Sequence, residues 1–481
     1  MQDSSQNQRL YDRVASILTE QIEDGALVVG ERVPSLRKMS NRLNVSISTV
    51  MQAYTNLEER GFIRSKPQSG YYVCPRHERD VSVPQKSKPR GKPRKVQLAN
   101  TVETIFGYAN RPGIVRLGVA NPGMELLPVR ALTRALRKVS ATLMEQAVDY
   151  CMPPGEIGLR RQIALRSADM DTKIDADDVV ITNGATEALV VSLQAVAKPG
   201  DVVAVESPAY FSVLQTIQTL GMLALEIPTD SGTGLCLDSL RAAIGENDVK
   251  AVVAVPNFHN PTGALMPDES KMNLVELLRE HGIPLIEDDV YGDLYFGDRR
   301  PRTCQAFDSE GLVLTCSSFS KTLAPGYRVG WVLPGRFRSE VMQRKQLLSS
   351  GTAGITQLAV AEFLRSGGYD RHLVQLRKRY REQLMMLRES VAEHFPGGTR
   401  ITRPQGGFVL WIQLPRGVDS IELYESALQQ NIGVTPGSLF STTGKYKNFI
   451  RLCAGHPWSD SMERGVATLG ALVYKRLYSP T

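Results

Sequence analysis

The sequence has few cysteines and histidines and lacks long apolar runs, the features of disulfide frameworks, zinc sites and membrane spans. Its 481 residues include only six cysteines, which are scattered, form no C-x-x-C pair and have no histidine at metal-ligand spacing. This pattern predicts reduced thiols and no metal site. No apolar run reaches the roughly 18 residues that a membrane span needs, and residues 1–8 are polar, unlike a secretory signal. We therefore expect a cytoplasmic protein that does not contact a membrane.

The excess of positive charge is concentrated in one short part of the sequence. The net charge is +7, yet residues 1–75 hold nine Lys and Arg against eight Asp and Glu, whereas residues 76–95 hold eight against two. Because residues 76–95 are rich in Pro, Lys and Arg and almost devoid of apolar side chains, they are predicted to form a flexible linker. The linker separates two predicted domains, 1–75 and 96–481, in keeping with the two or three domains that the length predicts.

Residues 1–75 carry the pattern of three helices followed by a hairpin. Apolar residues recur at helical spacing over 9–23, and Ser35 is suited to cap a second helix that ends near residue 43. Ser46 is suited to cap a third helix, which Gly61 ends. Residues 62–73 alternate loosely around Gly70, as a two-stranded hairpin does. This order predicts a winged helix-turn-helix.

Hydroxyl groups gather in the first turn of the third predicted helix, at Ser46, Ser48 and Thr49. In a helix-turn-helix this turn enters the major groove of double-stranded DNA, where hydroxyls and free helix amides suit phosphate and base-edge contacts. Arg37, one turn into the preceding helix, can reach a phosphate or a guanine. A structural role, with Ser46 as a cap and Arg37 solvated, stays open for each residue taken alone. The basic linker is likewise open to a second role in phosphate contact.

From about residue 96 onward, short apolar runs alternate with helix-length amphipathic segments. The runs lie at 178–183, 201–206, 250–256, 283–289 and 312–318. Strands of this kind need cover on both faces, so we predict an α/β fold with a mostly parallel sheet and helices on either side. From about 336 to 481 long helices give way to shorter mixed elements, which predicts a smaller α+β subdomain.

The most informative motif is SSFSKTLAPGYRVGW at residues 317–331. Lys321 can form an imine with an aldehyde, while Ser318, Ser320 and Arg328 offer hydroxyl and guanidinium donors to a nearby phosphate. Pyridoxal 5'-phosphate is an aldehyde that carries a phosphate. This constellation is therefore predicted to bind pyridoxal phosphate rather than to be an ordinary surface turn.

Other residues fit the same cofactor. Ala185 and Thr186 open a helix directly after a predicted strand, where free amides make an anion site, although strand–glycine–helix joints are common. Asp288, at a strand end in EDDVY, can keep a pyridine nitrogen protonated. The remaining candidates are Tyr291 and Asn260 as hydrogen-bond partners of the ring 3-oxygen, and Tyr210 as a ring that stacks on the cofactor.

Two further residues are open to more than one interpretation. Arg451 lies inside an apolar strand, in FIRLCAG, where a buried guanidinium needs a partner. A substrate carboxylate fits its fork bidentately, but a structural salt bridge is the alternative. Tyr150, in DYCMPPGEIGLR, precedes a Pro-Gly turn and carries no signal of its own.

The N-terminal motifs resemble the GntR family of regulators. The string ERVPSLRKMSNRLNVSISTVMQAYTNLEERGFI, followed by SGYYV, is similar to that family's helix-turn-helix and wing over about 65 residues. The resemblance implies that Arg37, Ser46, Ser48, Thr49 and the wing near Gly70 contact DNA. Many relatives have arginine where this chain has Ile47. Since isoleucine offers only an apolar contact, such as to a thymine methyl, the operator cannot be transferred from them.

Over residues 115–475 the chain resembles fold-type I aminotransferases. The resemblance implies that Lys321 is the Schiff-base lysine and that Arg451 holds the substrate α-carboxylate. It also implies that Tyr150 reaches the phosphate in the neighbouring subunit of a homodimer. The other cofactor contacts are implied to be Asp288 at the pyridine nitrogen, Asn260 and Tyr291 at the 3-oxygen, Tyr210 as the stacking ring, and Ala185, Thr186, Ser318, Ser320 and Arg328 at the phosphate.

The fusion resembles the MocR subfamily, whose members are commonly head-to-tail dimers. It implies a transcription regulator that senses pyridoxal phosphate, an amino acid or amine effector, or both. In the expected mechanism the effector displaces Lys321 from the imine, and closure of the small subdomain changes the spacing of two DNA readers. One alternative is a working aminotransferase that carries a DNA-binding domain. Another is a regulator that answers to pyridoxal phosphate alone.

Overall fold

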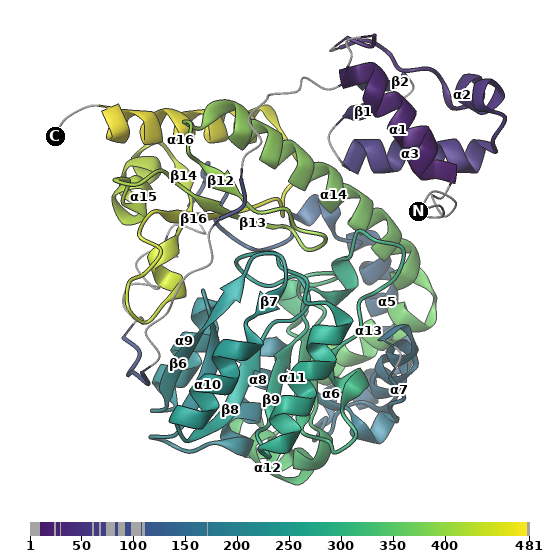
Figure 1. Cartoon of the computed structure of the whole chain (residues 1–481). Coiled ribbons are helices and arrows are strands. Elements are labelled where there is room, and N and C mark those ends of the chain that lie inside the picture. Colours follow the sequence, from purple (N-terminus) through teal and green to yellow (C-terminus); the bar gives the residue numbers. More distant parts are fainter. Residues whose placement is uncertain are drawn as a thin grey trace, which may run out of the picture. The chain divides into compact units, whose positions relative to one another are not determined.

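In the computed structural model the chain divides into two compact units, Met1–Asp80 and Val81–Thr481. We describe each unit by itself (Figure 1). The larger part of the predicted linker, 76–95, lies outside the described residues, and the predicted boundaries at 75 and 95 stay predictions. The described residues are 10–23, 26–28, 30–59, 62–66, 69–73, 82–84, 92–97, 107, 111–170 and 172–478.

Unit 1 is a three-helix domain with an antiparallel hairpin, as predicted. The Ser35 side chain accepts a hydrogen bond from Lys38 N at 3.3 Å and so caps α2, while Asn44 ends this helix in the left-handed conformation, at φ 51°. The buried core includes Leu18, Val50 and Leu57, none of which is exposed. The elements are α1 (Leu10–Glu23), α2 (Leu36–Leu43), α3 (Ile47–Glu59), β1 (Ile63–Lys66) and β2 (Gly70–Val73).

Unit 2 is built on an eight-stranded sheet in the order β4-β11-β10-β9-β8-β5-β6-β7. The five central strands from β10 to β6 run parallel, whereas β11 is antiparallel to both of its neighbours. The predicted α/β fold is confirmed. The strands are β4 (Val180–Thr182), β5 (Val202–Ser207), β6 (Leu223–Asp230), β7 (Gly234–Leu235), β8 (Val249–Ala254), β9 (Leu285–Asp288), β10 (Val313–Ser318) and β11 (Gly330–Leu333).

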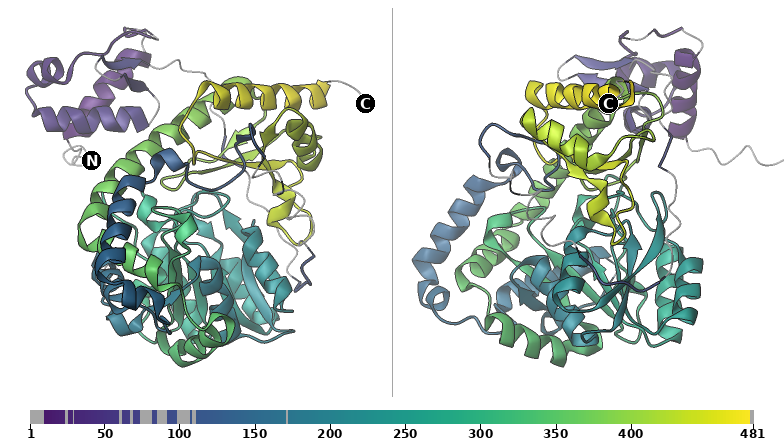
Figure 2. Two further views of the ribbon diagram at one scale, coloured as in Figure 1. Left: turned by 180° about the vertical axis from the view of Figure 1, so that it is seen from behind. Right: turned by 90° about the vertical axis from the view of Figure 1, so that its left-hand side faces the viewer.

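Helices cover both faces of this sheet (Figures 1 and 2). Because side chains alternate along a strand, Val203 and Val205 of β5 pack in the core that holds α8 and α9, while Ala204 packs in the core that holds α10 and α11. None of the described helices has both the length and the apolar character of a membrane span. The helices of this region are α5 (Val129–Thr142), α6 (Met144–Val148), α7 (Ile157–Arg166), α8 (Gly184–Val196), α9 (Phe211–Thr219), α10 (Leu237–Glu246), α11 (Asp268–Glu280), α12 (Arg338–Ser349) and α13 (Gly354–Arg365).

A smaller α+β part follows, reached through the long helix α14 (Gly368–His394). Its antiparallel sheet has the order β12-β13-β16-β15, and the pair β14-β3 includes residues that lie more than 300 positions apart in the sequence. The elements are β3 (Val115–Arg116), β12 (Arg400–Ile401), β13 (Val409–Gln413), α15 (Ser420–Gln429), β14 (Ile432–Gly433), β15 (Thr435–Pro436), β16 (Phe449–Cys453) and α16 (Asp460–Tyr478).

The described segments of the predicted linker, 82–84 and 92–95, are part of unit 2 and bond to other residues of it. Arg94 and Ala224, at the start of β6, exchange two backbone hydrogen bonds of 2.9 Å. Ile401 N donates to Ser82 O at 3.2 Å. These segments are therefore anchored, where composition predicted no packing.

Candidate functional site

Lys321 lies in the turn that follows β10. Its Nζ donates a hydrogen bond to Ala120 O at 2.8 Å. Burial and the positive charge of Arg451 lower the pKa of Lys321 from its ordinary value of 10.5 to about 8, and the carboxylate of Asp288 acts in the opposite direction. A lysine with such a pKa is available as a neutral amine near physiological pH, which is the form that attacks a carbonyl group.

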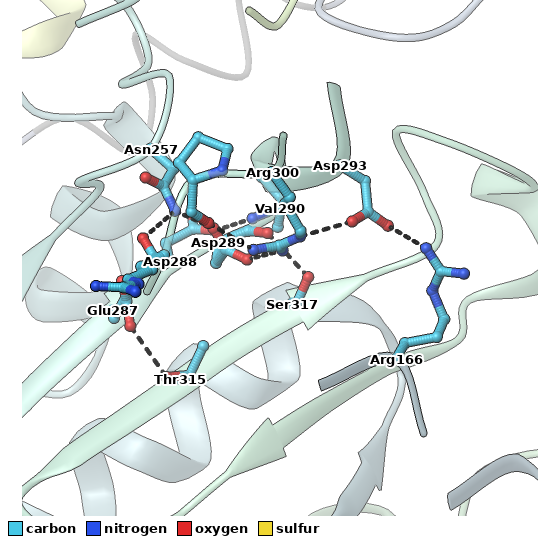
Figure 3. A network of polar contacts seen from close by, with 12 residues as sticks. Arg166, Asn257, Glu287, Asp288, Asp289, Val290, Asp293, Arg300, Thr315 and Ser317 are labelled. Atoms are coloured by element: carbon cyan, nitrogen blue, oxygen red, sulfur yellow. Dashed lines mark hydrogen bonds and ion pairs between the residues drawn. The ribbon is translucent and has the colours of Figure 1, made fainter. Parts of the chain in front are cut away.

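Three consecutive acidic residues end β9, and the structure gives each a different environment (Figure 3). Glu287 is buried and accepts hydrogen bonds from Cys304 N at 2.8 Å and Thr315 Oγ1 at 3.0 Å; burial and Asp289 raise its pKa to about 7. Asp288 accepts one hydrogen bond from Val290 N at 3.2 Å and has no ion-pair partner among the described residues. Burial raises the pKa of Asp288 to about 6. Of the three, Asp288 is the carboxylate left for a ligand.

Asp289, the residue after Asp288, takes part in a buried network of hydrogen bonds and ion pairs. It accepts a hydrogen bond from Asn257 Nδ2 at 2.8 Å and forms an ion pair with Arg300. The Nε of Arg300 donates to Asp293 Oδ1 at 2.7 Å, and Ser317 Oγ donates to Asp289 O at 3.0 Å (Figure 3). Because both neighbours of the β9 end are fixed in this way, the backbone that carries Asp288 is held in place.

The predicted phosphate-binding residues come together at the start of α8. The Nη1 of Arg328 lies 3.4 Å from Ser320 Oγ, and its Nη2 donates to Asn183 O at 3.0 Å, directly before the helix. Gly184 has a φ of +78°, which favours glycine, and a Cβ there would meet Arg328 Nη2 at 2.3 Å. Arg328 thus lies between Ser320 and the start of α8 (Gly184–Val196), whose first turn contains Ala185 and Thr186, and Ser320 N donates to Ser318 Oγ at 3.4 Å.

Arg451, in β16, is 1% exposed. Its Nη1 donates to Asn260 Oδ1 at 3.0 Å and its Nη2 to Gly118 O at 2.7 Å. No acidic residue of the described chain pairs with it, and its Nε has no hydrogen-bond partner there. The salt-bridge alternative weighed for Arg451 therefore finds no partner among the described residues.

Tyr291 and Tyr210 lie close to the same group of charges. The hydroxyl of Tyr291 is buried without a hydrogen-bond partner among the described residues, and burial raises its pKa well above the usual value. Electrostatic contacts link Tyr291 to Arg451, Cys453, Tyr210 and Asp288. The ring of Tyr210 is partly buried, 4.6 Å from that of Phe211.

Sequence reasoning missed several members of this site. The carbonyls of Gly118 and Ala120 accept from Arg451 and Lys321, although Lys321 and Ala120 are 201 residues apart. Cys453 is fully buried beside Arg451 and Lys321, and burial raises the pKa of its thiol. Backbone carbonyls leave no mark on side-chain type, so no sequence signal identifies them.

Tyr150 is placed differently from the other predicted residues. It is 82% exposed, and its backbone N donates to the Asp149 side chain at 2.7 Å. Within this single chain it does not join the residues around Lys321. Its predicted role concerns a neighbouring subunit, so that role stays a prediction.

The turn that carries Lys321 is attached to α14. The hydroxyl of Tyr369 lies 2.8 Å from Thr322 Oγ1, and the Nε2 of His372 donates to Thr322 O at 2.7 Å. Tyr369 is also 3.1 Å from Asp293 Oδ2, which connects this attachment to the network of Figure 3. Thr322 therefore links the turn of Lys321 to the first turns of the helix that leads to the smaller part.

On unit 1, the predicted DNA-contacting residues gather at the start of α3. Ser46 Oγ lies 2.7 Å from both Ser48 Oγ and Thr49 Oγ1 and accepts from Thr49 N at 3.1 Å. Arg37 is exposed on α2. Gly70 begins β2 at φ +104°, and a Cβ there would approach Arg32 Nε to 3.0 Å. The helix end and the wing are thus formed as expected; their contacts with DNA stay predictions.

Both parts of the chain match known families. The family of aminotransferase class I and II matches residues 112–469, and the gntR family of bacterial regulatory proteins matches residues 10–73. The uncharacterized HTH-type transcriptional regulator YjiR of Escherichia coli (strain K12) is 38% identical over 467 residues, which cover 97% of this chain and 99% of that protein.

Two solved structures are similar to the second unit. One is the kynurenine aminotransferase of Pyrococcus horikoshii in complex with PMP, KYN as substrates and KYA as products; its TM-score is 0.74, and it is 28% identical over 79% of this chain and 95% of its own. The other is LysN, the α-aminoadipate aminotransferase of Thermus thermophilus, complexed with N-(5'-phosphopyridoxyl)-L-leucine. Its TM-score is 0.73, and it is 28% identical over 78% of this chain and 95% of its own.

The fold and the matches define an aminotransferase-like domain preceded by a DNA-binding reader. The chain belongs to the aminotransferase class I and II family and carries a gntR-type helix-turn-helix domain. This combination is that of the MocR type of transcription regulator, so the predicted resemblance is confirmed.

Proposed function

We propose that this regulator binds pyridoxal phosphate at Lys321 and changes its affinity for DNA in response to the cofactor, an amino compound, or both. The observation that carries the proposal is the assembly around Lys321. Asp288, Arg328 and Arg451 all lie close enough to influence its pKa, in a chain that also carries a DNA reader. As a DNA-binding regulator it would act in the cytoplasm.

The phosphate end of the cofactor fits the start of α8. Arg328, Ser318, Ser320 and Thr186 would supply donors there, together with the backbone N of Ala185. The close approach of Arg328 to Gly184 leaves no room for a side chain but allows the backbone to face an anion. This cradle supports a phosphate rather than a neutral group.

The ring end fits the remaining residues. Asp288 would hold the pyridine nitrogen, Asn260 and the unpartnered hydroxyl of Tyr291 would hold the 3-oxygen, and Tyr210 would lie on the ring face. When bound, the group supplies an aldehyde for Lys321 and a protonated ring that withdraws electrons. The PMP and phosphopyridoxyl compounds in the two similar structures support the same class of cofactor.

Arg451 supports an effector that carries a carboxylate. Its buried guanidinium has no acidic partner among the described residues, and its Nε has no acceptor. A planar carboxylate satisfies such a fork with two hydrogen bonds. An amino acid held there would place its amino group next to Lys321. The same arrangement favours a second candidate function, that of a working aminotransferase.

The test is footprinting on the DNA upstream of the protein's own gene, at near-physiological salt, with a fragment of unrelated sequence as control. We expect a defined protected site whose affinity changes when pyridoxal phosphate or an L-amino acid is added. Steady turnover of an amino acid with a 2-oxo acid, at about 1 per second or more, together with DNA affinity unaffected by either ligand, would favour the aminotransferase instead.

We also propose a homodimer in which Tyr150 completes the partner's site. Large apolar side chains are exposed near Tyr150 in the sequence and near the end of α12, and the segment between α12 and α13, at Gly351 and Gly354, packs against residues 146–152. Exposed apolar side chains that gather on one surface mark protein interfaces. The residues are Met144, Val148, Met152, Leu347 and Leu348, between 46% and 78% exposed.

Sedimentation at micromolar concentration tests the dimer. The wild type is expected to have twice the mass of one chain, and Val148→Asp, which places a charge on this surface, is expected to sediment mainly as a monomer. Val374→Asp changes a valine that is 57% exposed on α14 and serves as the matched control. A monomeric wild type, or a dimer unaffected by Val148→Asp, would contradict the assignment.

A further inference from the structure

Helix α3 exposes two large apolar side chains at the end that is predicted to enter DNA. Ile47 is 48% exposed and Met51 is 51% exposed, and residues four apart lie next to each other along a helix. The core stripe of α3, formed by Val50, Tyr54 and Leu57, runs beside them. About half of each of these two side chains is thus left exposed on the surface of unit 1.

The hydroxyl groups of Ser46, Ser48 and Thr49, at the same end of α3, form hydrogen bonds with one another. Ser46 Oγ caps the helix by accepting from Thr49 N and also bonds Ser48 Oγ and Thr49 Oγ1. These short side chains are suited to phosphates near the helix N-terminus. Ile47 lies between Ser46 and Ser48 in the sequence, and Met51 lies one turn further along. In its first two turns α3 thus exposes two large apolar side chains, Ile47 and Met51, together with the polar Gln52.

We infer that Ile47 and Met51 read the methyl groups of thymine in the major groove. This inference rests on the proposed DNA-binding function and deepens it. The thymine 5-methyl is the apolar group that base pairs present in this groove. Isoleucine has no polar atom, and the methionine sulfur is only a weak acceptor. The operator should therefore have thymine rather than guanine at the base that Ile47 contacts and at the base that Met51 contacts.

The expected contribution follows from the burial of a methyl group. One buried methyl changes affinity by about fourfold, and two change it by about 15-fold in each half-site. Uracil differs from thymine in DNA only by lacking this methyl, and hydrogen-bonding groups stay the same. Replacement of thymine by uracil therefore isolates the apolar contact from all polar ones.

The experiment begins with a duplex selected from a random library by the full-length wild-type protein. Dissociation constants are then measured for that duplex and for versions with deoxyuridine at each thymine in turn. We expect two positions per half-site at which uracil weakens wild-type binding by about fourfold each. Ile47→Ala and Met51→Ala should each bind the selected duplex more weakly than the wild type. Each variant should also cease to distinguish thymine from uracil at one of these positions.

Leu10→Ala is the matched control, because Leu10 is a similar apolar side chain, 60% exposed on α1 of the same unit. It should discriminate thymine from uracil as the wild type does. Circular dichroism verifies that the variants fold. Equal wild-type affinity for thymine and uracil duplexes, or discrimination that survives in the Ile47→Ala and Met51→Ala double variant, overturns this inference alone. If the selection enriches no sequence, the DNA-reading function itself is wrong, and the inference falls with it.

Discussion

Replacement of Lys321 by alanine is expected to abolish covalent attachment of pyridoxal phosphate. Incubation with pyridoxal phosphate followed by borohydride should add one phosphopyridoxyl mass per wild-type chain and none to the variant. Lys321 Nζ is the amine with a lowered pKa that the site brings beside Asp288, Arg328 and Arg451. Peptide mass spectrometry locates the label, and the visible absorption band of the bound cofactor should be lost with it.

The control for this experiment is Lys138→Ala, which removes a lysine that is half exposed and paired with Glu362. Attachment at full stoichiometry is expected to persist there. Labelling of the Lys321→Ala chain to the wild-type extent would show that the cofactor site lies elsewhere.

The same labelling reports the pKa of Lys321. Only the neutral amine attacks, so the initial rate should be low below pH 8 and rise to a plateau above it, with a midpoint at about 8. Because the positive charge of Arg451 contributes to this low pKa, Arg451→Leu should move the midpoint to higher pH.

Arg451→Leu is also expected to abolish preference for ligands that carry a carboxylate. Truncating one partner of a buried charged pair costs roughly 2–5 kcal/mol, or at least about thirtyfold in affinity. Spectral titration should compare each L-amino acid to which the wild type responds with the corresponding amine that lacks the carboxylate. Leucine fits the apolar surroundings in β16, between Phe211 and Phe440, so the strand should be retained.

Arg451→Lys is a second variant for this test, because lysine keeps the charge but not the bidentate fork. It should recover part of the preference. If Arg451→Leu binds the amino acid and the amine with the wild-type ratio, the carboxylate is held by another group.

Local signals in the sequence were sufficient for most of unit 1. Ser35 and Asn44 define the ends of α2 through a cap and a left-handed residue, both of which are properties of single residue types. The central strands of the large sheet were likewise visible as uniform apolar runs. The pairing of β3 with β14 was not, because it joins Val115 to Ile432 and depends on how the whole chain returns on itself.

The functional site likewise contains some residues that local sequence motifs identify and others that only folding brings together. Lys321, Arg328 and the two serines occur in one continuous motif, so their chemistry could be recognised in the sequence. The role assigned to Asp288 stays a prediction; the structure adds that its neighbours Glu287 and Asp289 are engaged by other groups. The sequence does not reveal these partners, because Arg300 reaches Asp289 and Thr315 reaches Glu287 only when the chain folds. The anchoring of Arg94 on Ala224 similarly has no signal in a basic, proline-rich segment.

The attachment of Thr322 to α14 has a mechanical consequence. With 27 residues, α14 is roughly 40 Å long, and its first turns touch the residue next to Lys321. Its later turns, including Leu387 and Val391, are packed in the core shared with the smaller sheet (Figure 1). A rigid rod held near one end multiplies displacement: a rotation of roughly 3° about its first turn moves the far end by roughly 2 Å. A small rotation of α14 beside Lys321 would therefore move the smaller part by a larger distance.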